Sequence, residues 1–389
     1  MIKQQLFCKN CILPNNFLGI TLSPDGICNF CHNPVYNNEN WSKVQIDNKL
    51  RKNSLDDWKL ALEKMKQNQK KQQYDCVIGY SGGKDSTALL YKFIYEYKIR
   101  PLAITIDTGF MTDVAKQNIR KTLKKIEMIN NHILIESAVD TFTKLYKWHF
   151  FNHSSNHRSL TVDICDHCSD LIHSIVVKEA IKRNINNVIF GYSPDQIKRY
   201  FYEIPRKEAL YDWMPDLAFK DPFNDADRKW YINSEKISLK DIPRIILPYH
   251  VLDYNEKKII ELVESKELIE VGKADPVLTN CHVVKAALMF DLYRYGGLTY
   301  ALQYAELVRQ QENNQDKKKS RKNWLRLYKN IAQSILNGTF NEDGMKKFYD
   351  NIGISKEELL GSIIEQRNKD PNAEKISRNI ELIKIGKIK

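Results

Sequence analysis

The sequence predicts an α/β protein built on a parallel, doubly wound sheet. Two observations carry this prediction. Short apolar strands alternate with helical segments from Tyr74 onward, and three of the strands run into turns that contain glycine or aspartate. Strands separated by helices pair in parallel, so their carboxyl ends meet at one edge of the sheet, where ligands bind in such folds. A cysteine-rich start and a helical end flank this part of the chain.

The expected strands and helices follow one another as a repeat of strand and helix requires. The strands are short apolar runs over residues 76–79, 102–106, 132–135, 187–190 and 245–249. The spacing of apolar residues predicts helices over 118–129, 171–183 and 255–266. The long irregular stretch 192–244, rich in aromatic and charged residues, is either a substrate-recognition segment or a packed surface insertion.

The first expected strand leads into the loop Ser-Gly-Gly-Lys-Asp-Ser, residues 81–86, which precedes a helical run. A glycine loop before a helix N-terminus directs backbone N–H groups and partial positive charge at one point. The position of the first glycine of a Walker loop is occupied here by Ile78. We therefore expect a polyphosphate site of another kind, with a plain serine–glycine turn as the alternative.

Four cysteines near the start of the chain form two Cys-x-x-Cys knuckles, Cys8 with Cys11 and Cys28 with Cys31. A turn sequence, Pro24-Asp25-Gly26, precedes the second knuckle. This spacing is typical of a structural zinc site, in which four thiolates fill the tetrahedron and leave no position open. A chance arrangement of surface cysteines is the alternative.

A second set consists of Cys165 and Cys168, again spaced Cys-x-x-Cys, and Cys281 far downstream. The residues alone leave three interpretations open. These are an incomplete zinc site, a redox-active pair of Cys165 and Cys168, and an iron–sulfur cluster held by all three thiolates. Cys76 lies in an expected strand and is interpreted as a core residue.

Composition bounds the location and the partners. The 389 residues carry a formal net charge of +12, with a pI of about 9.1. This charge permits a polyanionic partner such as RNA, but a diffuse lysine excess also produces it. Nothing near Met1 resembles a secretion signal and no apolar run reaches membrane-spanning length, so we expect a cytoplasmic protein without membrane insertion. Thiols stay reduced there, which favours metal binding or catalysis over disulfides.

The 81–86 loop resembles the pyrophosphate loop of the PP-loop ATP pyrophosphatases, which have an adenine nucleotide α-hydrolase-like fold. That resemblance implies cleavage of ATP between the α and β phosphates. The Cys165 and Cys168 pair, with Cys281 beyond a Leu-Pro strand and a helix, is similar to the tRNA 2-thiolation members of the same group. Their pattern implies a 4Fe–4S cluster on these three cysteines that carries hydrosulfide to an adenylated carbon.

The N-terminal motifs resemble a different branch of the superfamily. The sequences Cys-Lys-Asn-Cys-Ile-Leu-Pro at 8–14 and Gly-Ile-Cys-Asn-Phe-Cys at 26–31 are similar to those of N-acetyl sugar amidotransferases of surface-polysaccharide and nonulosonic-acid pathways. This resemblance returns weakly at 293–297, Tyr-Arg-Tyr-Gly-Gly. It implies conversion of an acetamido to an acetamidino group with ammonia from a partner glutaminase. The second cysteine set departs from that pattern and favours sulfur.

Both resemblances imply the same residue roles. Lys84 would stabilise developing negative charge, Asp85 and Asp195 would hold Mg²⁺, and these three are the expected catalytic residues. The expected ATP-binding residues are Ser81, Gly82, Gly83, Lys84, Asp85, Ser86 and Asp107. Helix capping or turn formation is the alternative for each carboxylate.

We therefore expect a zinc ribbon over residues 1–35, a helical connector over 36–73, a PP-loop domain over 74–300 and a helical region over 301–389. The expected cofactors are ATP, Mg²⁺, Zn²⁺ and a 4Fe–4S cluster. The expected enzyme adenylates a carbonyl or amide oxygen, releases pyrophosphate and then AMP, and replaces the oxygen by sulfur. Amidotransfer to an N-acetyl sugar is the first alternative. A non-catalytic RNA-binding ribbon protein is the second, although binding alone needs no ATP site.

The expected substrate is a tRNA, a sugar or another small amide, and the expected partner is a sulfur donor or a glutaminase. The oligomeric state stays open, a homodimer included.

Overall fold

The computed structural model describes residues 6–33, 48–67, 73–154, 158–194, 202–274, 281–309, 311 and 313–385. The chain divides into two units, the first comprising residues 1–43, 146–165 and 282–389 and the second residues 44–145 and 166–281. The chain therefore passes between the units after Lys43, Leu145, Cys165 and Cys281. Among the described residues, no helix has the length and apolar character to cross a membrane.

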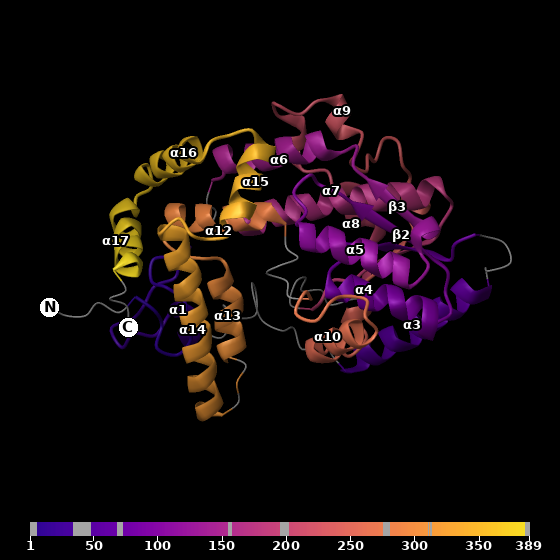
Figure 1. The fold of residues 1–389 in the computed structure, drawn as a ribbon, viewed down its shortest axis with the longest axis horizontal. Coiled ribbons are helices and arrows are strands. Elements are labelled where there is room, and N and C mark those ends of the chain that lie inside the picture. The colour runs from indigo at the N-terminus through magenta and orange to yellow at the C-terminus, as the bar shows by residue number, and fades with distance from the viewer. Residues whose placement is uncertain are drawn as a thin grey trace. The chain divides into compact units, whose positions relative to one another are not determined.

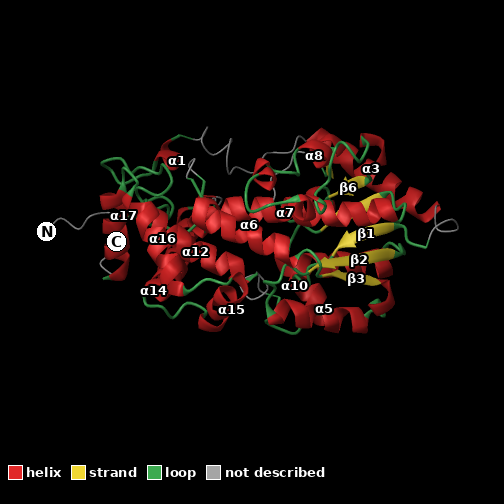
Figure 2. Ribbon diagram, turned by 90° about the horizontal axis from the view of Figure 1, so that it is seen from above, coloured by secondary structure: helices red, strands yellow, loops and turns green. Residues whose placement is uncertain are grey.

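The second unit is built on a six-stranded sheet with the order β3-β2-β1-β4-β6-β5. The strands are β1 (Cys76–Gly79), β2 (Pro101–Ile106), β3 (His132–Ile135), β4 (Asn187–Phe190), β5 (Glu203–Ile204) and β6 (Arg244–Ile246). All neighbouring pairs are parallel except β5 and β6. The predicted α/β fold with a parallel, doubly wound sheet is therefore confirmed, and Figure 2 shows β1, β2 and β3 side by side.

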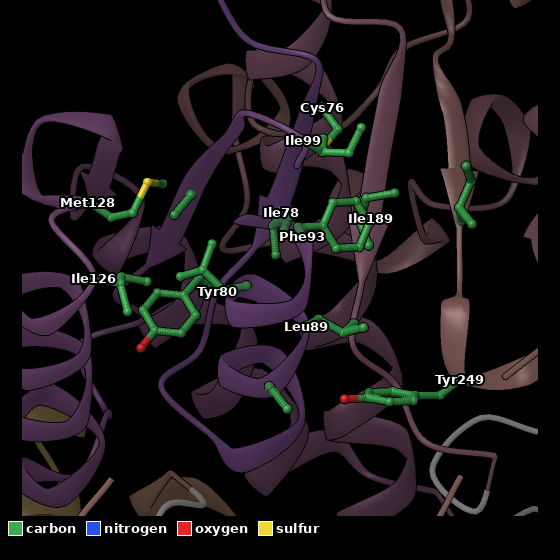
Figure 3. Packing of buried hydrophobic residues seen from close by; sticks show 14 of the residues in the cluster. Cys76, Ile78, Tyr80, Leu89, Phe93, Ile99, Ile126, Met128, Ile189 and Tyr249 are labelled. Carbon is green, nitrogen blue, oxygen red and sulfur yellow. The ribbon is translucent and has the colours of Figure 1, made fainter. Parts of the chain in front are cut away.

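Both faces are buried in the central strands β1, β2 and β4, because successive side chains point to opposite faces and both sets are largely apolar, whereas the edge strand β3 is partly exposed. On one face, Phe93 lies beside Ile78 and Ile189 (Figure 3). On the other face, Val77 and Val188 are equally buried. The helices that belong wholly to this unit are α3 (Asn48–Gln67), α4 (Lys84–Tyr91), α5 (Asp113–Lys125), α8 (Arg206–Tyr211), α9 (Asp225–Arg228) and α10 (Glu256–Ser265).

Two longer helices, α6 (Val139–Asn152) and α7 (Leu160–Lys182), begin in one unit and end in the other. The colours of Figure 1 follow both helices along the chain. Helix α7 begins well before the predicted start at residue 171, so Cys165 and Cys168 lie inside the helix. Two caps set this start: the Ser159 hydroxyl accepts from Val162 N–H at 3.2 Å, which the local sequence could have indicated. The carboxylate of Asp291 accepts from the backbone N–H groups of Leu160, at 2.8 Å, and Thr161, at 3.3 Å, and this tertiary cap is not visible in the local sequence.

Other boundaries differ from the prediction for local reasons. Helix α5 begins at Asp113 instead of residue 118, because the Thr112 side chain caps it by accepting from Ala115 N–H at 3.2 Å. The last predicted strand ends at Ile246, and Pro248 then opens a 3-10 turn. The stretch 192–244, expected to be irregular, contains β5, α8 and α9. Of the expected connector, residues 48–67 form α3, and the rest of its span lies largely outside the described residues.

The first unit is helical apart from the cysteine-rich segment at its start, so the predicted helical C-terminal part is confirmed. Its centre is α12, whose polar residues are buried along with its apolar ones; Asp291 has no exposed surface at all. Helices α15, α16 and α17 pack against α12, and α14 packs against α13. The helices are α1 (Asn29–His32), α12 (His282–Tyr295), α13 (Tyr300–Arg309), α14 (Asn314–Leu336), α15 (Glu342–Ile352), α16 (Lys356–Asn368) and α17 (Ala373–Lys384).

The glycine pair Gly296-Gly297 connects α12 to the cysteine-rich segment. Gly296 has φ +73°, a conformation that glycine adopts without strain. A Cβ on Gly297 would stand 2.6 Å from the ring of Phe17, so only glycine leaves room for that ring. Arg321 of α14 adds polar contacts, donating to the backbone carbonyl oxygens of Cys8 at 2.7 Å and Cys11 at 2.7 Å. The cysteine-rich segment is thus fixed to the helices of its own unit.

Candidate functional site

The glycine loop lies at the point where the winding of the sheet reverses. From β1 the chain adds β2 and β3 on one side, and it then returns to place β4 and β6 on the other. Ligands of open α/β sheets bind at such a switch point, beyond the carboxyl ends of the strands. Residues 81–86 follow β1 directly, and Gly191 follows the neighbouring β4. A Cβ on Gly191 would stand 3.1 Å from the backbone of Ser86, so the two strand ends adjoin.

The structure gives a separate reason for glycine at each of positions 82 and 83. Gly82 has φ +74°, and a Cβ there would meet Ile119 at 2.6 Å and the carbonyl oxygen of Ala115 at 2.7 Å. Gly82 therefore allows the loop to turn against α5. Gly83 is the N-cap of α4 and has no side chain to accept from the first-turn N–H groups. A Cβ there would meet only the Ser81 hydroxyl within 4 Å, so this position leaves a ligand room to approach the helix N-terminus.

Two hydroxyls brace the loop. The oxygens of Ser81 and Ser86 lie 3.2 Å apart. Ser86 also donates to the carbonyl oxygen of Gly83 at 3.2 Å, and Gly83 N–H lies 3.4 Å from the Ser81 hydroxyl. These weak bonds hold the loop open without using up the helix N-terminus, because hydroxyls can rotate toward another acceptor. The loop residues that the sequence identified are thus adjacent in space.

Lys84 and Asp85 form a buried ion pair beside the loop. The Lys84 ammonium lies 2.6 Å from Asp85 Oδ2, 3.2 Å from the Tyr254 hydroxyl and 3.3 Å from Glu256 Oε1. Burial alone would lower the pKa of Lys84, but the Asp85 carboxylate outweighs it and holds that pKa above its ordinary value. Burial raises the pKa of Asp85, and the Lys84 charge opposes that rise. Lys84 is therefore a fixed cation at this site.

Tyr249 and Tyr254 complete the ion-pair site, and the sequence analysis did not identify them. The Tyr249 hydroxyl donates to the carbonyl oxygen of Asp85 at 3.0 Å, and the Tyr254 hydroxyl lies 3.2 Å from Asp85 Oδ1. The two rings meet edge to face at 5.3 Å. The available signal was their position just after β6, at the carboxyl edge of the sheet; Tyr249 was predicted as the last residue of that strand, without a role at the site.

Of the two other carboxylates predicted at the site, Asp107 and Asp195, the structure describes only the first. Asp107 follows β2 and is buried; its Oδ1 accepts from Gly109 N–H at 2.9 Å and its Oδ2 lies 2.7 Å from the Lys116 ammonium. Asp107 therefore forms the turn that was its alternative role, at the strand edge where a nucleotide would lie. Asp195 lies outside the described residues.

Cys165 and Cys168 are spaced by one helical turn on α7 and are half-buried, as is Cys281 at the start of the segment that leads into α12. Tyr192, next to Gly191 at the end of β4, contacts the same helix. Its hydroxyl lies 2.9 Å from His173 Nε2 and 3.5 Å from the Ser169 hydroxyl. The residue after Cys168 therefore adjoins the strand end that touches the glycine loop.

The four ribbon cysteines meet as a metal site requires. All four sulfur atoms lie within 4.8 Å of one another, with Cys8 to Cys31 at 3.9 Å and Cys11 to Cys28 at 3.7 Å. A Zn–S distance of about 2.3 Å in a tetrahedron gives sulfur–sulfur separations of about 3.8 Å. Backbone N–H groups of Asn10, Cys11, Leu13 and Cys28 point at these sulfurs. The donor set fits a tetrahedral thiolate-bound ion such as Zn²⁺.

The surroundings shift the four thiols in opposite directions. Hydrogen bonding from neighbouring thiols, Cys11 first, places the pKa of Cys31 at about 7 and that of Cys8 far below its ordinary value. Burial raises the pKa of Cys11, and at Cys28 hydrogen bonding with Cys11 lowers the pKa but Cys31 and Cys8 outweigh it and raise it. Burial opposes the charge of Arg309, but Cys11 and Glu306 keep its pKa above the ordinary value. A site of four thiolates around a divalent ion keeps excess negative charge, and Arg309 and Arg321 provide cations beside it.

Comparison with known proteins gave likenesses among solved structures and no match in sequence. No protein-family model matches the chain, and no curated protein sequence matches it. Among solved structures, the chain is similar to the U34-tRNA thiolase NcsA from Methanococcus maripaludis, described with its 4Fe–4S cluster. The identity is 15%, the match covers 80% of this chain and 91% of that chain, and the TM-score is 0.31. A score this low does not establish a shared fold, so the functional assignment rests on the residues of this chain.

Proposed function

We infer that the chain is an ATP-dependent transferase that adenylates a carbonyl or amide oxygen of its substrate and then replaces that oxygen. One observation carries this inference: the Ser-Gly-Gly-Lys-Asp-Ser loop lies at the switch point of a parallel sheet, with an uncapped helix N-terminus beside Lys84. Both features favour a polyphosphate, and the loop sequence is similar to that of the PP-loop pyrophosphatases.

The chemistry asks this chain for positioning and charge stabilisation more than for proton transfer. The substrate oxygen attacks the α-phosphorus of ATP, and the bond to pyrophosphate breaks. The amides of residues 83–86 and the Ser81 and Ser86 hydroxyls would hold the departing pyrophosphate, while Lys84 would neutralise its new charge. The incoming nucleophile then bonds to the substrate carbon, and AMP leaves with the original oxygen.

Asp85 is the proposed Mg²⁺ ligand at this site. Its two carboxylate oxygens already interact with Lys84 and Tyr254, so coordination of Mg²⁺ would replace one of these contacts. Lys84 would then be released toward the phosphates. Asp195 and Asp107 are proposed as the second carboxylate and the border of the nucleotide site.

Sulfur is the proposed nucleophile, because the second cysteine set supplies three thiolates that the amidotransferase pattern does not call for. Cys165, Cys168 and Cys281 would hold a 4Fe–4S cluster, which would supply bound sulfur for transfer. The contact from Tyr192 to Ser169 supports this assignment, since it brings the Cys168 turn toward the strand end beside the glycine loop. The ribbon thiolates would hold a structural Zn²⁺. Amidotransfer is the alternative outcome, favoured by the knuckle motifs at residues 8–14 and 26–31.

The deciding experiment is purification without oxygen, followed by element analysis and product analysis. We expect one zinc together with iron and acid-labile sulfide, a brown protein, and AMP plus pyrophosphate as products from ATP. Replacing Cys168 by Ser should remove iron and sulfide and leave zinc in place. A colourless protein that contains zinc alone would favour ammonia as the nucleophile. ADP as the product would refute adenylation.

A further inference from the structure

A basic groove lies on the first unit and is lined by no residue assigned above to adenylation. It has a volume of about 510 Å³ and runs along α14 beside the first knuckle. Six of its nine lining residues are cationic and none is acidic. The lining residues are Lys9, Lys318, Arg321, Lys322, Leu325, Arg326, Lys329, Asn330 and Gln333. A second groove, which shares Arg326 and Asn330, contains Trp324 and Asn323.

This concentration of cations is unfavourable for the isolated helix. The basic run 317–322 occupies the first turns of α14, where the helix dipole disfavours positive charge. Lys318, Lys322 and Arg326 follow one another at four-residue spacing, which places like charges side by side. Burial, and after it the charge of Arg321, lowers the pKa of Lys329. A polyanion would relieve all of these repulsions at once.

We propose that this groove binds the phosphate backbone of a single nucleic-acid strand. A phosphate backbone supplies negative charge at regular intervals along a line, which matches a line of cations on one helix. The amide side chains of Asn330 and Gln333 in this groove offer hydrogen bonds to bases. In the adjoining groove, which also contains Asp316, the Trp324 indole already stacks on Tyr304 at 4.6 Å. The inference names a partner and does not require the adenylating chemistry.

A membrane surface fits the groove less well. A basic helix that binds a bilayer inserts its apolar face between the lipids. The apolar face of α14 is already occupied within its own unit, since Leu325, Tyr328, Ala332 and Ile335 are buried. The cations also line a hollow, whereas a bilayer presents a broad surface.

The test measures binding of labelled single strands of about 20 nucleotides to the full-length protein over a series of salt concentrations. The triple variant Lys318→Ala, Lys322→Ala, Arg326→Ala removes three groove cations and spares Arg321, which holds the knuckle. The matched control is Lys346→Ala, Lys356→Ala, Lys375→Ala, which removes the same charge from exposed positions of the same unit. Parallel arms use RNA and DNA of one sequence, and vesicles containing anionic lipid.

The groove variant should bind at least about tenfold more weakly at moderate salt, and its plot of log affinity against log salt should be shallower by about 2. The control should behave like the unaltered protein. A preference for RNA over DNA would identify the strand, and equal binding would show recognition of backbone alone. Equal losses in variant and control, absence of binding at low salt, or binding to vesicles only would overturn the proposal. Release of pyrophosphate from ATP, assayed separately, reports on adenylation and not on the groove.

Discussion

The ribbon thiols and the glycine loop both start from short motifs, yet they are completed in opposite ways. In the ribbon, four donors from residues 8–31 turn inward and meet one another. In the loop, Gly83 faces open space, and Tyr254, 170 residues further along the chain, holds the Lys84 ammonium. A site for a permanent ion can thus be finished locally. A site whose ligand must leave needs distant groups that hold its charge while the ligand is absent.

Lys84→Ala tests the glycine-loop site and should have the largest effect of all the variants. Pyrophosphate formation from ATP should fall by about a hundredfold to a thousandfold or more, because one preorganised charge is removed from the leaving group. Lys92→Ala, on the turn that continues the same helix, is the control and should keep full activity. A thermal unfolding curve for each variant separates loss of chemistry from loss of fold. Undiminished activity in Lys84→Ala would remove this residue from the mechanism.

Cys8→Ser tests the four-cysteine site of the ribbon. One missing thiolate should release the zinc and lower the free energy of unfolding by about 5 kcal/mol or more, because structural zinc contributes folding energy directly. Cys76→Ala is the matched control, since Cys76 is just as buried but lies in β1. The control should lose some stability and keep its zinc. If Cys8→Ser retained a full equivalent of zinc, the four ribbon cysteines would be wrongly assigned as its ligands.

Asp291 adds a third case to the comparison: a buried carboxyl that accepts from hydroxyl and backbone N–H donors, with the charge of His153 acting on it as well. Burial raises its pKa to about 6 from an ordinary value near 3.8. Below about pH 4 the carboxyl is protonated in the folded and unfolded chain alike. Between about pH 4 and 6 the folded protein keeps a proton that the unfolded chain loses, so the free energy of unfolding falls as pH rises. Above pH 6 this contribution reaches about 3 kcal/mol of destabilisation.

Asp291→Asn removes this titration. Urea unfolding of both proteins across this pH range should show the variant gaining stability relative to the unaltered protein as pH rises. Taking the difference between the two proteins cancels the effect of pH on the zinc site. A difference that stays constant with pH would mean that Asp291 does not titrate in this range.

Gly297→Ala should have the smallest effect. It tests whether zinc binding by the ribbon depends on the docking of the ribbon to the helices. The added methyl group meets the Phe17 ring at 2.6 Å, and such overpacking costs about 1–3 kcal/mol. Gly361→Ala on α16 is the control, because nothing lies within 4 Å of its added Cβ, and it should raise stability slightly. The zinc content of Gly297→Ala should stay complete. Loss of zinc would show that zinc binding depends on this docking, and would contradict a ribbon site that is completed by local residues alone.

The same contrast explains what the sequence could predict. The strand 76–79, the loop 81–86 and the four ribbon cysteines depend on neighbours along the chain, and each is found where the local pattern indicates. Tyr249, Tyr254 and Glu256 join the loop only through the folded sheet, so no pattern around residue 84 contains them. The start of α7 is a mixed case, because Ser159 caps it locally while Asp291, which accepts from the Leu160 N–H, lies 131 residues further along the chain.

The docking of the ribbon also has a consequence for synthesis on the ribosome. Arg321, which donates to the Cys8 carbonyl oxygen, follows it by 313 residues, and Asn379, which donates to the Asn15 carbonyl oxygen, follows by 364. At about 5–20 residues per second, the nascent ribbon waits roughly 15–75 s for these partners to be translated. Its thiols lack these docking contacts during that interval, so early capture of a metal ion would protect them from oxidation until translation is complete.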